Sequence, residues 1–288
     1  MRISTRMFQD SALRSVRDGQ RLLGRLQEEV TTGRRIRTVS DDPIQATQVM
    51  HMQSELRDLG QYQRNATEAA TRLNTEDVTI TSAREILQKI RDLAIGVEGM
   101  DRFSPDRQAA VTAIEQLREQ LVALGNTRLG NEYIFGGGQT ATPPFLRDGT
   151  YVGDSTLRQV EIDKGTLMPT NHPGDAFFEG ALAGVAELER SLTVGTGLQV
   201  QAAIAGLEDS ENQMIAAQAE TGARLQQIQT TGESLLLRIA SLSDQRDSLG
   251  NADPAEATIR LMAAQSALER AYTAIGKVLS TNLLDYLR

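Results

Sequence analysis

The sequence of 288 residues lacks several residue types on which protein chemistry commonly depends. It contains no cysteine, which excludes disulfides, iron–sulfur clusters, cysteine-based zinc sites and thiol catalysis. It contains no tryptophan, and its six phenylalanines and five tyrosines are few for a globular enzyme. Two histidines cannot form a three-histidine zinc site. These absences favour a protein without redox or cofactor chemistry.

Long apolar runs are also absent. The longest uninterrupted runs are a few residues, whereas a membrane-spanning helix needs about 20. The first 16 residues, MRISTRMFQDSALRSV, contain no apolar segment of the kind that a cleaved secretory signal requires. We therefore expect neither insertion into a membrane nor a cleaved signal peptide.

Charge is distributed unevenly along the chain. Residues 1–37 contain nine arginines and four acidic residues, whereas the rest is acidic and brings the formal net charge to -8. A basic arm is one feature of nucleic-acid-binding proteins. These arginines, however, are spread around a helix-forming segment, and Phe8 is the only aromatic residue among them that could stack on a base. We expect no nucleic-acid partner.

Both ends of the sequence show the hydrophobic periodicity of coiled-coil helices. Near the N-terminus a stripe comprises Leu13, Val16, Gln20, Leu23, Gln27 and Val30. The two glutamines interrupt its apolar character, and Leu22 and Leu26 widen it. Near the C-terminus a heptad ladder comprises Leu261, Gln265, Leu268, Tyr272, Ile275, Leu279, Asn282 and Tyr286. We expect the two helices to pair with each other and to pack against other copies, with the apolar members of both stripes as the assembly seam.

Proline positions predict where helices begin. Three prolines follow a residue that can cap a helix: Asp42-Pro43, Ser104-Pro105 and Asp253-Pro254. The stretch 43–98 contains no further proline and would span about 80 Å as one helix. Other helices are expected over about 105–124, about 198–249 and from 254 onward. Such lengths are typical of bundles and coiled coils.

The middle of the chain has a different composition. Residues 133–178 hold six of the eleven aromatic residues and the four remaining prolines, and LRQVEI at 157–162 alternates like a short strand. We therefore predict a mainly α fold, a long antiparallel helical bundle or coiled coil formed by the N- and C-terminal regions, with a small β-rich insertion. The expected parts are an inner coiled-coil domain (1–40 and 250–288), a central helical bundle (41–135 and 190–249) and the outward insertion (136–189).

No group of residues in the sequence indicates catalysis. A di-metal helical bundle needs Glu-x-x-His pairs, but the residues three before His51 and His172 are Gln48 and Pro169. The glycines at 136–138 lack the Gly-Lys-Ser/Thr ending of a phosphate-binding loop and indicate a flexible turn instead. No Gly-x-Ser-x-Gly motif is present. We expect no enzymatic activity, no catalytic or metal-binding residues and no cofactor.

Specific segments resemble the flagellar hook-associated protein 3 family, the hook–filament junction proteins of the flagellin superfamily. The start MRISTRMFQDSA, the turn at 33–43 and the ending NLLDYL at 282–287 are similar to that family. The most specific family motif comprises Tyr133, Ile134, Phe135, Gly136, Gly137, Pro144 and Phe145. The resemblance spans almost the whole chain. Filament-forming flagellin is the nearest alternative, and a helical scaffold or signalling rod is a more distant one.

The resemblance implies a structural, self-assembling part of the flagellum. It implies a homo-oligomeric ring between hook-associated protein 1 and flagellin, and an extracellular location at the hook–filament junction. It further implies export through the flagellar type III apparatus, without a cleaved signal, after a cytoplasmic chaperone has bound the C-terminal helices.

Overall fold

The computed structural model describes residues 2–286, and the side chains of Met7 and of residues 10–276. The chain is mainly α-helical, as predicted. Its helices are α1 (Arg2–Thr32), α2 (Pro43–Val97), α3 (Pro105–Gly125), α4 (Phe178–Val194), α5 (Gly197–Gly250) and α6 (Pro254–Tyr286). Short elements complete it: β1 (Arg128–Leu129), β2 (Glu132–Tyr133), β3 (Gln159–Asp163), β4 (Thr166–Pro169) and a 3-10 turn, η1 (Gly174–Ala176).

The helix starts expected at proline are confirmed, although the caps differ. Asp42 Oδ1 accepts the N–H groups of Ile44 and Gln45 at 3.1 and 3.0 Å, and Asp253 caps α6 in the same way. The side chain of Ser104 makes no cap hydrogen bond at the start of α3, so the expectation of a cap there is wrong. Asp101 stabilises the turn before α3 instead. Its Oδ1 accepts the N–H of Phe103, and its backbone O accepts the N–H of Ser104.

Contacts divide the chain into two compact units. Unit 1 is Met1–Arg57 with Ala240–Arg288, and unit 2 is Asp58–Ile239. Helices α2 and α5 therefore contribute to both units. The expected division into three parts stays a prediction.

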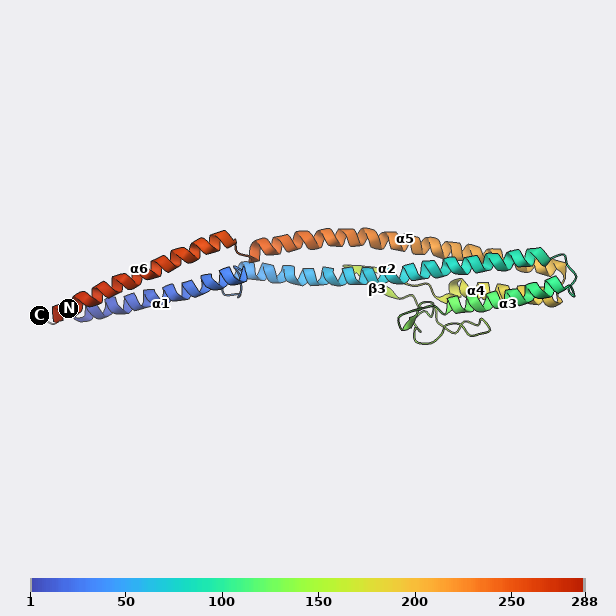
Figure 1. Ribbon diagram of the computed structural model, residues 1–288, viewed down its shortest axis with the longest axis horizontal. Coiled ribbons are helices and arrows are strands. Elements are labelled where there is room, and N and C mark those ends of the chain that lie inside the picture. The colour runs from blue at the N-terminus through green and yellow to red at the C-terminus, as the bar shows by residue number, and fades with distance from the viewer. Residues whose placement is uncertain (1, 287–288) are drawn as a thin grey trace. The chain divides into compact units, whose positions relative to one another are not determined.

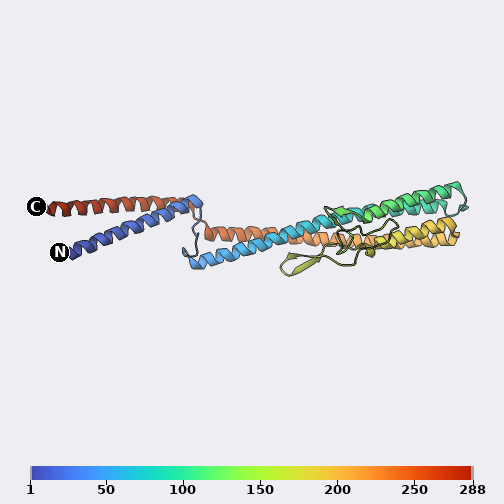
Figure 2. The same cartoon turned by 90° about the horizontal axis from the view of Figure 1, so that it is seen from below.

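Unit 1 is built on the two terminal helices. Helices α1 and α6 run antiparallel and pack against each other (Figures 1 and 2). The connections beside them are joined by backbone hydrogen bonds, because Arg35 N–H donates to Gly250 O and Ala252 N–H donates to Gly33 O, each at 2.9 Å. The expected pairing of the N- and C-terminal helices is thus confirmed.

Unit 2 contains the main apolar core. Side chains from α2, α3, α4 and α5 meet in it, including Ile80, Ile90, Ile114, Leu121, Val185, Leu188, Val200 and Leu207. Helices α2 and α5 lie side by side along much of the unit (Figure 1), where Arg84 donates to Gln218 and Arg91 pairs with Glu211. Apolar residues three and four apart explain why residues 178–194 form α4, although the sequence suggested β-rich structure as far as residue 189.

The expected strand over 157–162 is present as β3, paired antiparallel with β4. The strand begins at Gln159, two residues later than expected, and the exposed Leu157 precedes it. Ile162 is fully buried beside Leu73 and Ile228. Strand content within 136–189 is limited to this hairpin and an isolated bridge between Phe145 and Tyr151. Among residues 2–286, no helix combines the length and apolarity needed to cross a membrane.

Candidate assembly surface

The seam between α1 and α6 is formed by residues at heptad spacing. On α6 the buried or half-buried positions are Ala257, Leu261, Ala264, Leu268, Ala271 and Ile275. On α1 they are Ala12, Val16, Gly19, Leu23 and Leu26. Small and large side chains alternate, which allows the helices to approach closely. A Cβ added to Gly19 would lie 3.1 Å from Leu268 Cδ1, so Leu268 packs directly over this glycine.

Half of the predicted seam residues lie on this interface. These are Val16, Leu23, Leu261, Leu268 and Ile275. Three others, Leu13, Val30 and Tyr272, are exposed in the chain. Leu279 and Tyr286 lie outside the residues whose side chains the structure describes. As residues of an assembly surface, all ten stay a prediction.

The interleaved positions of the seam differ from the expected ones by one residue. Ala264 and Ala271 face α1, whereas the expected Gln265 and Tyr272 are exposed. The physical reason is that burial of the Gln265 side chain would remove its amide from water at a cost in free energy, whereas the small apolar side chain of alanine fits between closely packed helices. Gln20, also expected in the seam, is exposed and donates from its amide to Tyr272 Oη at 2.7 Å. This hydrogen bond joins α1 to α6 at the solvent-exposed edge of the interface.

Large apolar side chains remain exposed on both terminal helices. On α1 they are Met7, Leu13, Leu22 and Val30, and on α6 they are Ile259, Met262 and Tyr272. Exposed apolar residues in such numbers are typical of surfaces that bind other proteins. The two helices thus combine a narrow intramolecular seam with apolar positions that are open to neighbours.

The family motif in unit 2 is part of an aromatic core. Ile134 and Phe135 are fully buried, and Phe145 is nearly so. The ring of Phe135 meets those of Phe177 and Phe178 edge to face, with centroids 5.8 and 4.9 Å apart. Aromatic residues from Phe135 to Phe178 therefore gather in one cluster, which explains their concentration in the middle of the chain.

The glycines of the motif form a tight turn against Asp154. Gly137 has φ +65°, and a Cβ there would lie 2.0 Å from Asp154 O. Gly138 N–H donates to Asp154 Oδ1 at 2.7 Å. The Tyr151 hydroxyl lies between two acceptors, Phe135 O at 3.0 Å and Asp154 O at 2.8 Å, and shares its one proton between them. Burial raises the pKa of Tyr151 to about 12, which keeps its hydroxyl a donor. The turn is thus a packed anchor in which the carboxylate of Asp154 accepts the N–H of Gly138.

A buried polar cluster in unit 2 was not singled out from the sequence. Glu76 on α2 is fully buried and accepts hydrogen bonds from the ring and the backbone N–H of His172 and from Thr221 Oγ1. His172 Nε2 lies 3.2 Å from Glu220 Oε2. Burial lowers the pKa of His172, but the hydrogen bond and charge of Glu76, aided by Glu220, raise it overall. Because 96 residues separate Glu76 from His172, no local pattern could have revealed the pair.

A second polar cluster fixes β2 and β3 to α2. The buried Arg72 donates to Glu132 Oε2 at 3.0 Å, and Arg158 pairs with the same carboxylate. The hydrogen bond from Arg158 lowers the pKa of Glu132. Both clusters join the insertion to the helices, and among the described residues no group of His, Asp or Glu side chains is arranged to hold a metal.

Comparison with known proteins agrees with these features. The family described as the bacterial flagellin N-terminal helical region matches residues 3–140. Flagellar hook-associated protein 3 of Escherichia coli (strain K12) is 26% identical over 95% of this chain and 96% of that protein. The protein of the same name from Salmonella typhimurium is 25% identical over 80% of this chain and 82% of its own length. Proteins named flagellin match less of the chain.

A solved structure shows the same fold. The flagellar hook-associated protein 3 of Legionella pneumophila superposes with a TM-score of 0.62 at 14% identity, over 70% of this chain and 98% of that one. At this identity the likeness concerns the fold alone. The resemblance drawn from the sequence is confirmed by these relatives, which cover 95% and 80% of this chain.

Proposed function

We propose that this chain, a relative of the flagellar hook-associated proteins 3, is a structural subunit that links the hook region of the bacterial flagellum to its filament. The observation that carries the proposal is the correspondence with a protein of that name along almost the whole length of both chains. Relatives named flagellin match only 44% and 56% of this chain. The chain has no enzymatic role in this proposal.

The partners in this proposal are other axial proteins of the flagellum. Copies of the chain form a ring, with hook-associated protein 1 on one side and flagellin on the other. The exposed apolar residues of α1 and α6 support this, because they offer packing surface that the chain alone does not cover. The seam residues named above are the proposed contacts of this assembly.

Export through the flagellar type III apparatus without a cleaved signal is part of the same proposal. A cytoplasmic chaperone covers the C-terminal helix before export. The exposed Ile259 and Met262 on α6 support this step, since a free subunit would otherwise present them to solvent. A chain without cysteine also cannot be locked by a disulfide before it passes through a narrow channel.

Immuno-labelling of intact flagella tests the proposal. Antibodies against the chain should label a single site at the boundary of hook and filament, and deletion of the gene should leave hooks without filaments. Labelling along the filament, together with polymerisation of the purified chain alone into long filaments, would favour the alternative that it is a flagellin. Labelling confined to the cell body would contradict both and favour a helical scaffold.

A further inference from the structure

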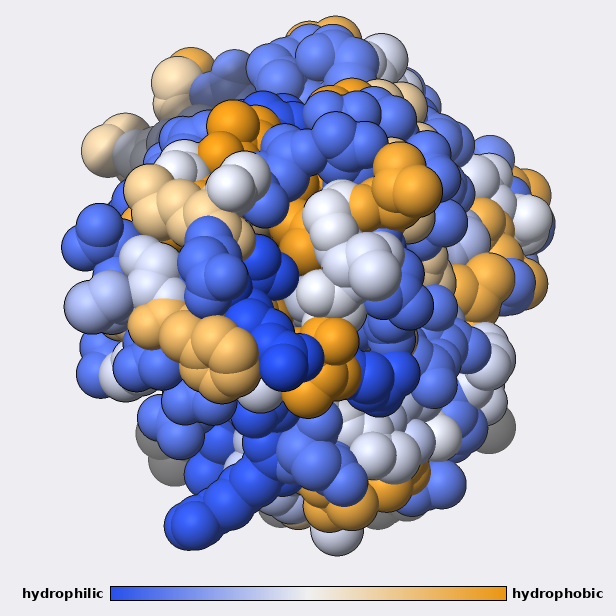
Figure 3. Space-filling view, turned by 90° about the vertical axis from the view of Figure 1, so that its right-hand side faces the viewer, coloured by the Kyte–Doolittle hydropathy of each residue, from blue (hydrophilic) through white to orange (hydrophobic). Residues whose placement is uncertain are grey.

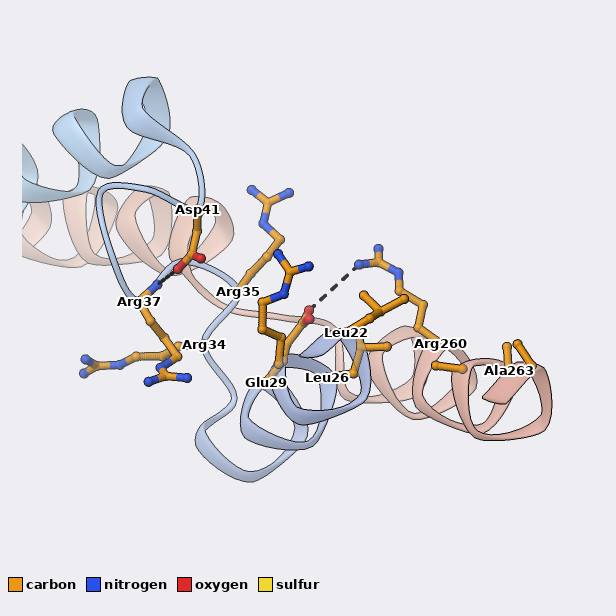
Figure 4. Close-up of a pocket in the computed structure, with 12 residues that line it drawn as sticks. Leu22, Leu26, Glu29, Arg34, Arg35, Arg37, Asp41, Arg260 and Ala263 are labelled. Carbon is orange, nitrogen blue, oxygen red and sulfur yellow. Dashed lines mark hydrogen bonds and ion pairs between the residues drawn. The ribbon is translucent and has the colours of Figure 1, made fainter. Parts of the chain in front are cut away.

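Unit 1 contains a groove that combines an apolar floor with a strongly basic rim. It lies between α1, the connection before α2 and the first turns of α6, with a volume of about 610 Å³. We call it the arginine groove. Its lining includes the apolar Leu22, Leu26, Ala263, Ala264 and Ala267, and the rim carries Arg25, Arg34, Arg35, Arg37 and Arg260 (Figure 4).

The acidic residues of the groove do not neutralise these arginines. Only Glu29 and Asp41 line it. Asp41 Oδ2 accepts the backbone N–H groups of Arg37 and Thr38 at 3.1 and 2.9 Å, so this carboxylate stabilises the turn. Glu29 reaches Arg260 at 3.9 Å (Figure 4). The groove therefore keeps an excess of positive charge.

Two of the arginines are available to a partner. Among the described residues, the guanidinium groups of Arg25 and Arg34 make no hydrogen bond and no ion pair. Arg35, in contrast, donates to Gln45 and to Leu249 O, and Arg37 pairs with Glu28. A guanidinium group binds a carboxylate through two parallel N–H groups, so Arg25 and Arg34 fit an acidic partner.

A segment of the same sequence has the complementary properties. The acidic turn, residues 98–106, comprises the connection between α2 and α3 and the first two residues of α3. It carries Glu98, Asp101 and Asp106 against a single exposed arginine, Arg102. Its Phe103 is 69% exposed, and Met100 is exposed beside it. Figure 3 looks onto this end of unit 2 and shows apolar side chains between polar ones. The segment thus presents both apolar side chains and carboxylates.

The acidic turn has a defined conformation. Phe103 N–H donates to Asp101 Oδ1 at 2.8 Å, and Arg107 Nη1 donates to Met100 O at 2.8 Å. The guanidinium of Arg102 stacks over the ring of Phe103, 4.6 Å from its centroid. Because the turn is already ordered, its burial in a partner would cost little conformational entropy.

We propose that the arginine groove of one copy of this chain binds the acidic turn of a second copy. Phe103 and Met100 pack on the apolar floor, while Asp101 and Asp106 pair with Arg25 and Arg34. The contact joins different surfaces of the two copies, so it propagates from copy to copy and closes into a ring if the rotation between copies allows. It rests on the proposed function, for which it names one contact between subunits.

Charge reversal in the purified full-length chain tests the proposal by sedimentation velocity. The unchanged chain should self-associate more strongly at low salt, and Arg25→Glu with Arg34→Glu should weaken this association about tenfold. Arg17→Glu with Arg57→Glu changes the net charge equally outside the groove and should have little effect. A chain with Asp101→Lys and Asp106→Lys should bind the groove variant and restore association. Equal association of all variants, or none at any concentration, would overturn the proposal.

Cross-linking provides a measurement that does not depend on charge. The chain has no cysteine, so single cysteines can be introduced cleanly. A mixture of Phe103→Cys and Ala263→Cys chains should give heterodimers with a short bismaleimide. A mixture of Phe103→Cys with Leu237→Cys, which is exposed on α5, should not. Equal yields would contradict the contact while leaving the labelling test of the junction function untouched.

Discussion

The imidazole ring of His172 is hydrogen bonded to the carboxylate of Glu76, which is fully buried on α2. The other ring nitrogen lies 3.2 Å from Glu220 on α5, so the ring lies between two carboxylates from different helices. Arg224 binds the same Glu220 and donates to Asn171 O beside the histidine. These hydrogen bonds and ion pairs fix the loop before η1 to α2 and to α5.

This cluster should make the stability of unit 2 depend on pH. Because the pKa of His172 is raised in the folded chain, its protonated form stabilises the fold fully below the unfolded pKa of about 6.5. That stabilisation is lost as the pH rises through the folded pKa. We expect the free energy of unfolding in urea to fall above about pH 6.5, and His172→Gln to remove this fall and to cost about 2 kcal/mol at pH 6.

His51 supplies a matched control for the histidine prediction. It is the only other histidine and is exposed on α2. His51→Gln should leave the pH dependence unchanged. A His172→Gln chain that keeps the full dependence would show that other groups are responsible.

The terminal helices should exchange their amide protons much faster than the core of unit 2. Among the described residues, only Val16 and Leu26 on α1 and Ala257 on α6 are buried, whereas α2 and α5 contribute many fully buried side chains. Helices with so little buried surface are marginal in water. Hydrogen exchange with mass spectrometry on the free chain should show weak protection in 10–32 and 254–276. Strong protection there would contradict this prediction.

A charge in the seam should separate the terminal helices without unfolding unit 2. Leu268 packs over Gly19, and Leu268→Asp would place a carboxylate there at a cost of about 3 kcal/mol. We expect loss of helical circular dichroism from α1 and α6, loss of assembly and an unchanged melting transition of unit 2. Ile259→Asp, on an exposed position of α6, is the control for helicity. If Leu268→Asp assembled normally, the seam would not be needed.

The turn of the family motif should depend on a glycine. An alanine at Gly137 would need a positive φ, and its Cβ would clash with Asp154 O at 2.0 Å, so Gly137→Ala should destabilise unit 2 by about 2 kcal/mol or more. Gly222 is exposed within α5 with nothing within 4 Å of an added Cβ, and Gly222→Ala should stabilise the helix by about 0.5–1 kcal/mol. Chemical denaturation measures the free energy of unfolding of both variants, which should fall for Gly137→Ala and rise for Gly222→Ala.

The helices could be predicted from the sequence because their signals are local. The Asp-Pro pairs at 42 and 253 mark helix starts within one residue, since the aspartate caps the N–H groups that follow it directly. Helix α4 was partly missed because the aromatic and proline-rich segment before it suggested turns and strands. Its apolar residues do recur three and four positions apart, but that pattern is short.

The register of the terminal seam could be predicted only in part. Leu261, Leu268 and Ile275 are large and apolar, so their positions were clear. Alanine is only weakly apolar, and nothing in the sequence distinguished Ala264 from Gln265 before the separation of the helices was known. The buried pair of Glu76 and His172 was not predictable at all, because it depends on the tertiary fold rather than on spacing along the chain.

The hydrogen bond between Gln20 and Tyr272 joins residues that are 252 positions apart. During synthesis on the ribosome, α1 emerges long before α6. Its seam residues Leu23 and Leu26 therefore stay exposed to solvent until α6 has been synthesised. Closing so long a loop is also slow, because its entropy must be lost before any contact forms. During every round of synthesis, therefore, the first helix is a target for proteases and for the wrong partners, and its many arginines help to keep it dissolved through that interval.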